Sequence, residues 1–388
     1  VPRICVRYEC VPMRFIKHVY KIHTYAQDGR LFEGKTPVSA FLNSSYDGSF
    51  IAGLMELRYI QSLPVERIIN YFESHGFTLK KPTAHKLMEK ASSLFENLYK
   101  CIRQTALSDP YKAADETYYK ILVPEKNSKG KGVRKGYLWV VVGINTRMIY
   151  LLYDDGSRSE KVILNELGGC KGIIQSDGYS PYRKLESDAY PHITRIPCLQ
   201  HIKRKFIDCG EDDPDAKRIV EMINTLYQNE HKHKIGVDGW TVEQNLVHRK
   251  KYAPDILGEI KDVLDDIEER GDLLPKSELK EAITYLRNEW NAVVDIFNYG
   301  DTYLDNNIVE RMNRYISLSR KNSLFFGSHK GAERGAILYT IALTCRMNKV
   351  NLFEYLTDVI NRTAEWQPNT PLEKYRQLLP DRWEKAND

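Results

Sequence analysis

Leu304-Asp305-Asn306-Asn307-Ile308-Val309-Glu310-Arg311 places a single acid, Glu310, at the start of a strongly basic segment. Residues 311–330 contain five lysines and arginines and no acidic residue. A carboxylate in such surroundings is either a salt-bridge partner or a metal ligand beside a polyanion. Two earlier acids, Asp115 and Asp177, each adjoin an apolar run that predicts a strand. Two strand-borne aspartates and a helix-borne glutamate are what a two-metal phosphodiester site needs.

Composition and charge narrow the class of protein. The chain has 388 residues, enough for two or three domains, and 42% of them are hydrophobic, as in an ordinary globular protein. The formal net charge is only +5, but basic residues gather at 126–135, 201–205 and 311–330, whereas 254–289 is mostly acidic. Basic patches next to acidic motifs favour a nucleic-acid partner.

Cysteine usage and hydropathy indicate the compartment. Seven scattered cysteines, an odd number in a long chain, indicate reduced thiols rather than a disulfide framework. No apolar run approaches the roughly 18 residues of a membrane span, and the first residues contain no signal-peptide core. We therefore expect a soluble cytoplasmic protein with no membrane partner.

The hydrophobic pattern divides the chain into six parts. Residues 1–46 carry short β-like runs, such as 14–25, with a turn at Asp28-Gly29. Residues 47–108 are helical, and the pattern fits a DNA-binding helix-turn-helix and a plain helical bundle about equally well. The other parts are an α/β core at 109–210, an all-helical insertion at 211–299, the rest of the core at 300–365 and an irregular tail at 366–388.

Periodicity also predicts the individual elements. Helices are expected at 49–61, 65–74, 84–105, 159–167, 198–206, 215–228, 242–251, 254–269, 277–297, 306–318, 330–347 and 351–362. Strands are expected at 113–123, 137–144, 148–153, 172–176 and 193–196. This order predicts an α/β fold, with Asp177 at the carboxyl end of a strand, where α/β sheets place their sites.

Each acid taken alone has an ordinary structural interpretation. Asp115 could end a strand, Asp177-Gly178 forms turns in any protein, and Glu310 could pair with Arg314 on a helix surface. The three together, each on the right kind of element and in order, favour a catalytic site. Carboxylates suit Mg²⁺ or Mn²⁺, and two such ions can activate a nucleophile and stabilise a leaving alkoxide.

Basic residues near these acids are candidates for phosphate contacts. The loop at 124–136 is either a solvated hairpin or a phosphate-contacting finger, and we favour the finger because the loop continues the strand that carries Asp115. Arg311 and Lys321 are the first candidates elsewhere. The full set of predicted DNA contacts is Lys129, Lys131, Arg134, Lys135, Lys203, Arg204, Lys205, Arg311, Arg314, Arg320 and Lys321.

Zinc is the remaining metal to weigh. Cys198 and His201 could ligate zinc with Cys209, but no second ligand pair completes a tetrahedral site, so we expect both to be structural residues near the active site. Cys5, Cys10, His18 and His23 fit zinc-finger spacing only loosely, and ordinary residues of a small β arm, at most a degenerate zinc-finger remnant, are the favoured interpretation.

Several motifs in one order resemble those of bacterial transposases of the insertion-sequence-sixty-six family. The motifs are Ala114-Asp115-Glu116-Thr117, Ser176-Asp177-Gly178-Tyr179, Cys198-x-x-His201 with Arg204-Lys205-Phe206, Asn306-Asn307-x-x-Glu310-Arg311, Arg320-Lys321-Asn322-x-Leu324-Phe325-x-Gly327-Ser328 and Leu378-Leu379-Pro380-x-x-Trp383. The resemblance covers residues 12 to 383. The chain departs from the family pattern near its start, where Tyr20–Tyr25 stands in place of an expected cysteine pair.

The resemblance implies a ribonuclease H-like core with the catalytic and metal-binding triad Asp115, Asp177 and Glu310. It implies cleavage of DNA at element ends and transfer of the freed 3′-hydroxyl to target DNA, with two Mg²⁺ ions. It also implies an α-helical insertion before the glutamate, N-terminal DNA-binding elements, assembly as a homo-oligomer on DNA and accessory proteins from the same element. The alternatives are a metal-dependent nuclease or resolvase of the same fold and a catalytically idle DNA-binding remnant.

Overall fold

The computed structural model describes residues 8, 13–35, 39–41, 44–126, 130, 132–210, 212–367 and 369–385. The chain forms two compact units: one comprises Val1–Ile102, Lys120–Arg134 and Tyr315–Asp388, and the other comprises Arg103–Tyr119 and Lys135–Arg314. All three predicted catalytic acids fall in the second unit. No helix among the described residues is both long and apolar enough to cross a membrane.

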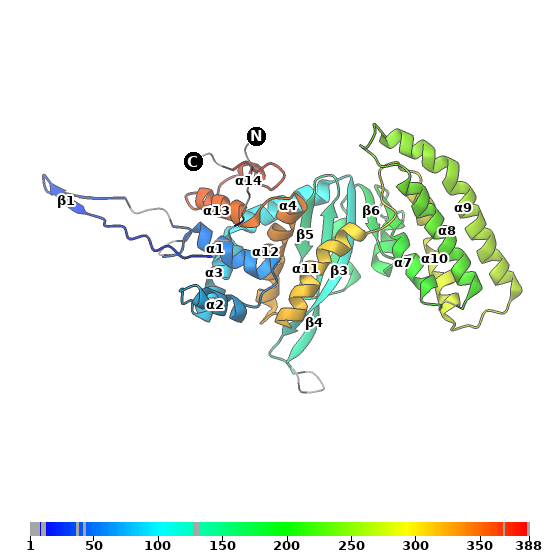
Figure 1. The fold of residues 1–388 in the computed structure, drawn as a ribbon, viewed down its shortest axis with the longest axis horizontal. Coiled ribbons are helices and arrows are strands. Elements are labelled where there is room, and N and C mark those ends of the chain that lie inside the picture. The colour runs from blue at the N-terminus through cyan, green and yellow to red at the C-terminus, as the bar shows by residue number, and fades with distance from the viewer. Residues whose placement is uncertain are drawn as a thin grey trace, which may run out of the picture. The chain divides into compact units, whose positions relative to one another are not determined.

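A five-stranded mixed sheet forms the centre of the second unit (Figure 1). Its strands are β3 (Tyr111–Leu122), β4 (Val133–Gly143), β5 (Met148–Leu152), β6 (Gly172–Ser176) and β7 (Ile193–Pro197), in the order β5-β4-β3-β6-β7. β4 and β5 are antiparallel, whereas β3, β6 and β7 run parallel. The sheet is mixed, and helices alternate with its strands from β5 to α7, so the predicted α/β class is confirmed.

Four further helices of this unit lie close to the sheet in sequence. They are α5 (Glu160–Leu167), α6 (Ser180–Arg183) with the short 3₁₀ turn η2 (Lys184–Glu186), α7 (Leu199–Ile207) and α11 (Asn307–Ser323), whose last residues belong to the other unit. α7 follows β7 directly, with Cys198 as its N-cap residue. This short connection places the start of α7 at the same sheet edge as the end of β6.

The helical insertion consists of α8 (Pro214–His231), α9 (Val242–Arg270) and α10 (Glu278–Ile296) (Figure 1). It shares one hydrophobic core with the sheet: Ile196 of β7 and Phe206 of α7 join Leu226, Leu264 and Leu286 of the insertion in a single buried cluster. The insertion is therefore packed directly on the sheet edge that carries Asp177.

One prediction in this region is wrong. Two helices were expected at 242–251 and 254–269, but α9 runs unbroken through Pro254. Proline in a helix interior costs about 3 kcal/mol because it removes one backbone hydrogen bond and crowds the preceding turn. Burial of Leu257, Ile260 and Leu264 along the same helix outweighs that cost.

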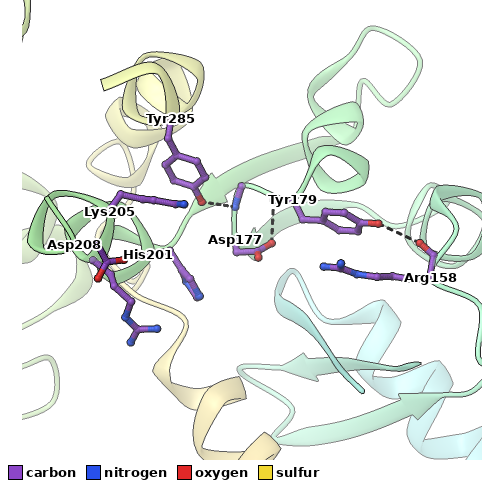
Figure 2. Close-up of a pocket in the computed structure, with 9 residues that line it drawn as sticks. Arg158, Asp177, Tyr179, His201, Lys205, Asp208 and Tyr285 are labelled. Atoms are coloured by element: carbon purple, nitrogen blue, oxygen red, sulfur yellow. Dashed lines mark hydrogen bonds between the residues drawn. The ribbon is translucent and has the colours of Figure 1, made fainter. Parts of the chain in front are cut away.

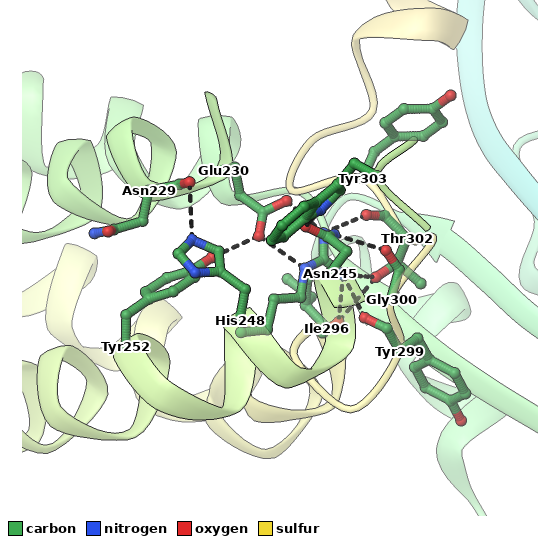
Figure 3. A network of polar contacts seen from close by, with 12 residues as sticks. Asn229, Glu230, Asn245, His248, Tyr252, Ile296, Tyr299, Gly300, Thr302 and Tyr303 are labelled. Carbon is green, nitrogen blue, oxygen red and sulfur yellow. Dashed lines mark hydrogen bonds and ion pairs between the residues drawn. The ribbon is translucent and has the colours of Figure 1, made fainter. Parts of the chain in front are cut away.

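A buried polar network fixes the segment that leads from the insertion to α11 (Figure 3). Arg249 of α9 makes a double ion pair with Glu230 of α8, at 2.7 Å for each hydrogen bond. The same guanidinium donates to the Thr302 carbonyl at 2.6 Å, and Asn245 donates to the Gly300 carbonyl at 2.7 Å. The insertion thus holds the backbone just before the Glu310-bearing helix.

Helices dominate the first unit. They are α1 (Gly48–Met55), which continues as a π-helical turn (Glu56–Ile60), α2 (Val65–Ser74), α3 (Lys81–Leu94), α4 (Glu96–Ser108, shared with the second unit), α12 (His329–Met347), α13 (Leu352–Thr363) and α14 (Leu372–Arg376). α2 and α3 pack together and are joined at Gly76, whose φ of 81° is the left-handed conformation that glycine adopts easily. The predicted helix, glycine turn and helix are confirmed.

Three predictions in the first unit are wrong. A single helix was expected at 84–105, but Phe95, whose side chain is fully buried, leaves the helical conformation between α3 and α4. The tail is not wholly irregular, because α14 forms where Tyr375 is buried against Trp366. Of the described residues before position 46, β1 (Thr24–Gln27) and β2 (Arg30–Glu33) alone form strands, so most of the expected β run at 14–25 is not a strand, and Asp28-Gly29 is the expected turn.

Candidate active site

Asp115 lies inside β3, the central strand of the sheet, and not at a strand end. Its carboxylate accepts the side-chain N–H of Asn313 at 2.7 Å and the backbone N–H of Glu116 at 2.8 Å. Burial, with a further contribution from the negative charges of Glu116 and Asp177, raises the pKa of Asp115 to about 8. Asp115 and Asp177 are therefore close enough to repel each other.

Asp177 follows the last residue of β6, and hydrogen bonds fix the loop that begins there (Figure 2). Arg195 donates to the Asp177 carbonyl at 2.7 Å, and the Gly178 N–H donates to the Tyr285 hydroxyl at 2.8 Å. The Asp177 carboxylate accepts the Tyr179 N–H at 3.1 Å, which is the turn expected of an Asp-Gly pair. Because Tyr285 belongs to α10, the helical insertion contacts the acid-bearing loop directly.

A buried ion pair strengthens this connection. Arg195 of β7 lies 2.6 Å from Glu289 of α10, and both side chains are almost completely buried. The Arg195 guanidinium also contacts Glu186 at 2.5 Å. One arginine therefore joins the sheet, the insertion and the loop that carries Asp177.

Glu310 lies in the first turn of α11, and two contacts of Asn306 fix the start of that helix. The Asn306 side chain donates to the Ala114 carbonyl of β3 at 3.0 Å, and its backbone N–H donates to the Cys198 sulfur at 3.2 Å. Glu310 itself lies 3.8 Å from His201 of α7. Asn313, one helical turn further along the same face, is the residue that contacts Asp115.

The three acids therefore lie on elements that are held together at one end of the sheet. Asp115 and Asp177 interact electrostatically, and Glu310 is linked to Asp115 through Asn313 and to the Asp177 side through His201. His201 and Asp177 line the same pocket of about 360 Å³ (Figure 2).

Cations surround this pocket. Arg204 and Lys205 of α7 line it, and so does Arg158, which stacks on the Tyr179 ring with its guanidinium carbon 4.1 Å from the ring centre. Lys205 also lies over the ring of Tyr285, 6.0 Å from its centre. The pocket thus combines one carboxylate of the candidate site with cationic and aromatic side chains, a combination suited to a nucleotide or a phosphate.

The other predicted DNA contacts are distributed more widely. Arg311 and Arg314 are exposed on α11, Arg320 and Lys321 belong to its last turn in the first unit, and Lys203 lies on α7. Arg134 and Lys135 are exposed at the start of β4, where Lys135 lies over the rings of Tyr118 and Tyr137. Lys129 and Lys131 lie outside the described residues, so the finger stays a prediction. Cys5 and Cys10, which the zinc-finger interpretation requires, also lie outside them.

Sequence reasoning missed several residues of the site. Glu116 accepts a hydrogen bond from Arg158 at 2.9 Å and one from Tyr182 at 3.3 Å, and burial raises its pKa. The adjacent pair Asp115-Glu116 was the available signal for it, and the helical spacing from Glu310 was the signal for Asn313. Nothing local in the sequence singles out Arg158 or the distant Tyr285.

Clustered, partly buried carboxylates beside a cationic pocket fit a protein that acts on a phosphate ester. A family model described as "Transposase IS66 family" matches residues 43–334, which is most of the chain. The chain belongs to this family.

Similar curated proteins come from Sinorhizobium fredii (strain NBRC 101917 / NGR234), and each is described as an uncharacterized protein. The protein y4jD is 26% identical over 346 residues, which cover 86% of this chain and 65% of the relative. The protein y4hP is 24% identical over 404 residues, which cover 98% of this chain and 70% of the relative. The chain thus spans about two thirds of the length of these relatives.

Proposed function

We propose that the chain is a DNA transposase that cleaves the DNA ends of its element and transfers the freed 3′-hydroxyl to target DNA. Membership of the transposase family supports the general activity. The strand order β5-β4-β3-β6-β7, with Asp115 on the central strand and Asp177 after its parallel neighbour, supports a ribonuclease H-like core.

The crowding of Asp115, Glu116 and Asp177 is the observation that carries this proposal. Burial and mutual repulsion raise the pKa of Asp115 to about 8, which disfavours folding at neutral pH. Carboxyl groups held at such a cost are typical of functional sites. Carboxylate oxygens are the ligands that Mg²⁺ prefers, so Asp115, Asp177 and Glu310 fit the hard divalent ions of the predicted site. When bound, such ions supply charge neutralisation and an activated nucleophile for phosphodiester chemistry.

The residues of the chain itself would position the site and the DNA. Asn313 orients the Asp115 carboxylate, while Arg195 and Tyr285 hold the Asp177 loop. Arg204 and Lys205 would bind phosphates that flank the scissile bond. Exposed Arg311 and Arg314 would extend that contact along the DNA.

The wider assembly is also part of the proposal. We propose that α2 and α3 bind DNA as a helix-turn-helix and that the insertion at 211–299 supports the Asp177 loop. We further propose that the protein acts as a homo-oligomer on DNA with accessory proteins of the same element.

The test uses linear DNA that contains the coding sequence with its genomic flanks, a supercoiled target plasmid and Mg²⁺. The proposal predicts strand breaks at inverted repeats in the flanks and covalent joining of those ends to the plasmid. Asp115→Asn should abolish both while DNA binding is retained. Breaks without joining would instead favour a nuclease or resolvase, and DNA binding without breaks would favour an idle remnant.

A further inference from the structure

Cys198, His201 and Glu310 form a second cluster of metal-binding side chains at the edge of the candidate active site. One ligand atom from each residue lies within 4.8 Å of the other two. Cys198 and His201 are one turn apart at the start of α7, and Glu310 approaches from the first turn of α11. From the sequence, Cys209 was one example of a further ligand, but the Cys209 thiol contacts the Lys205 carbonyl instead.

The distances suit a small tetrahedral ion. The Nε2 atom of His201 lies 3.8 Å from the Oε1 atom of Glu310. Around a tetrahedral zinc ion, bond lengths of 2.0–2.3 Å separate neighbouring ligand atoms by roughly 3.3–3.6 Å. All three ligand atoms lie within 4.8 Å of one another, which is within about 1 Å of the separations around such an ion.

Two surrounding hydrogen bonds hold the cluster in place. The Cys198 sulfur accepts the Asn306 N–H at 3.2 Å, and the Leu199 N–H donates to the Leu304 carbonyl at 2.9 Å, so α7 and the segment before α11 are joined. The Nδ1 atom of His201 is buried and has no hydrogen-bond partner among the described residues.

From this geometry we infer that Cys198, His201 and Glu310 bind one transition-metal ion of the zinc class. Sulfur, nitrogen and oxygen ligands together suit Zn²⁺, whereas Mg²⁺ requires oxygen ligands. Three protein ligands leave the fourth position for water or for a group of the DNA. On binding, the Cys198 thiol releases its proton to solvent and the sulfur coordinates as thiolate.

This site shares Glu310 with the proposed transposase centre but does not rest on that function. A glutamate bound to the zinc-class ion is withdrawn from the oxygen-ligand site, so the two ions compete for one carboxylate.

The test is a titration of the full-length chain with Co²⁺, which reports thiolate coordination and tetrahedral geometry by absorbance, without DNA. We expect one cobalt per chain, a sulfur-to-cobalt charge-transfer band and displacement by Zn²⁺. The band should disappear in Cys198→Ser and persist in the matched control Cys209→Ser, which removes a cysteine outside the cluster near the other end of α7. A parallel series in a Cys5→Ser/Cys10→Ser background removes the N-terminal thiols.

Ligand loss should weaken binding strongly. Glu310→Gln and His201→Asn should each raise the cobalt dissociation constant by more than about 100-fold, beyond the roughly 10–100-fold cost of losing an outer-shell partner. Circular dichroism and melting curves show whether each variant folds. His201→Asn is the mildest of the ligand variants because the His201 side chain is partly exposed and the contacts of Cys198 are kept. A band that survives Cys198→Ser, or wild-type affinity in Glu310→Gln, would overturn the inference. If the protein binds cobalt but does not cleave DNA, only the transposase proposal is refuted. If it cleaves DNA but does not bind cobalt, only the proposed metal site is refuted.

Discussion

Replacing Asp115 by asparagine should stabilise the metal-free protein while removing its catalytic function. In the unfolded chain this carboxyl ionises near pH 3.8, whereas in the folded protein burial and the charges of Glu116 and Asp177 raise its pKa to about 8. Well below pH 3.8 the Asp115 carboxyl is protonated in both the folded and the unfolded state, so its raised pKa does not lower the free energy of unfolding. As the pH rises from 3.8 to 8, the unfolded state loses the proton first, so folding is progressively disfavoured.

The size of the effect follows from the same pKa values. At pH 7 the difference in protonation corresponds to about 4 kcal/mol against folding. Asparagine cannot ionise, and a flip of the Asn313 amide, whose oxygen has no hydrogen-bond partner among the described residues, can restore its contact. Relaxation of the neighbouring charges in the wild type leaves an expected gain of roughly 1–3 kcal/mol at pH 7.

The assay is urea unfolding in EDTA, from pH 4 to pH 8.5, for the wild type, Asp115→Asn and the exposed control Asp208→Asn. The stability gain of Asp115→Asn should be near zero at pH 4, grow with pH and level off above pH 8. The control removes a charge from the same pocket without relieving burial and should stay within about 0.5 kcal/mol of the wild type at every pH. A loss of stability in Asp115→Asn at pH 7 would refute this description of the site.

Three other perturbations test the supports of the site and its DNA contacts. Arg249→Met should lower the free energy of unfolding by about 3–5 kcal/mol, because its buried carboxylate partner is left unpaired; thermal or urea unfolding measures this. Tyr285→Phe should cost about 1 kcal/mol and slow DNA cleavage, because the Gly178 N–H loses its acceptor; unfolding and cleavage rates measure it. Replacing Arg204 and Lys205 by alanine should make the slope of log K against log salt less negative by about 2, measured by DNA binding at several salt concentrations.

Each of these three perturbations has a matched control variant. Arg287→Met removes a more exposed arginine and should cost less than about 1 kcal/mol, so an equal loss for Arg249→Met would argue against a special role of the buried pair. Tyr299→Phe removes a tyrosine hydroxyl elsewhere in the same unit and should leave cleavage unchanged. Alanine at exposed Lys261 and Lys276 of the insertion should leave the salt slope of DNA binding unchanged. If this variant changes the slope as much as the Arg204 and Lys205 variant does, α7 has no special role in DNA binding.

Local patterns predicted most of the α/β core because its strands are strongly apolar. The strand that ends at Ser176 and the turn at Asp177-Gly178 have the predicted bounds, since a buried run followed by a turn pair is a local signal. Pro254 shows where local rules fail. Proline disfavours the interior of a helix, but the burial of Leu257 and its neighbours in the tertiary structure outweighs this preference. That burial cannot be predicted from the local sequence pattern.

Only part of the candidate site could be predicted from the sequence. The carboxylates could be predicted because acids beside apolar strands are conspicuous. The supports from the insertion could not, because Tyr285 and Glu289 lie more than a hundred residues from Asp177 along the chain and reach it only through tertiary packing. The third partner of Cys198 and His201 was missed for the same reason, since Glu310 meets them across two helices.

The most direct test of the central claim is Mn²⁺ binding by calorimetry, in the presence of a short DNA duplex, to the wild type, Asp115→Asn, Asp177→Asn and the control Asp208→Asn. These two aspartates lie outside the cluster of Cys198, His201 and Glu310, so their replacement leaves every ligand of that cluster in place. If the carboxylates hold the catalytic ions, both aspartate variants lose Mn²⁺ binding and the control keeps it. Equal binding by all four proteins would contradict the assignment of Asp115 and Asp177 to a metal centre.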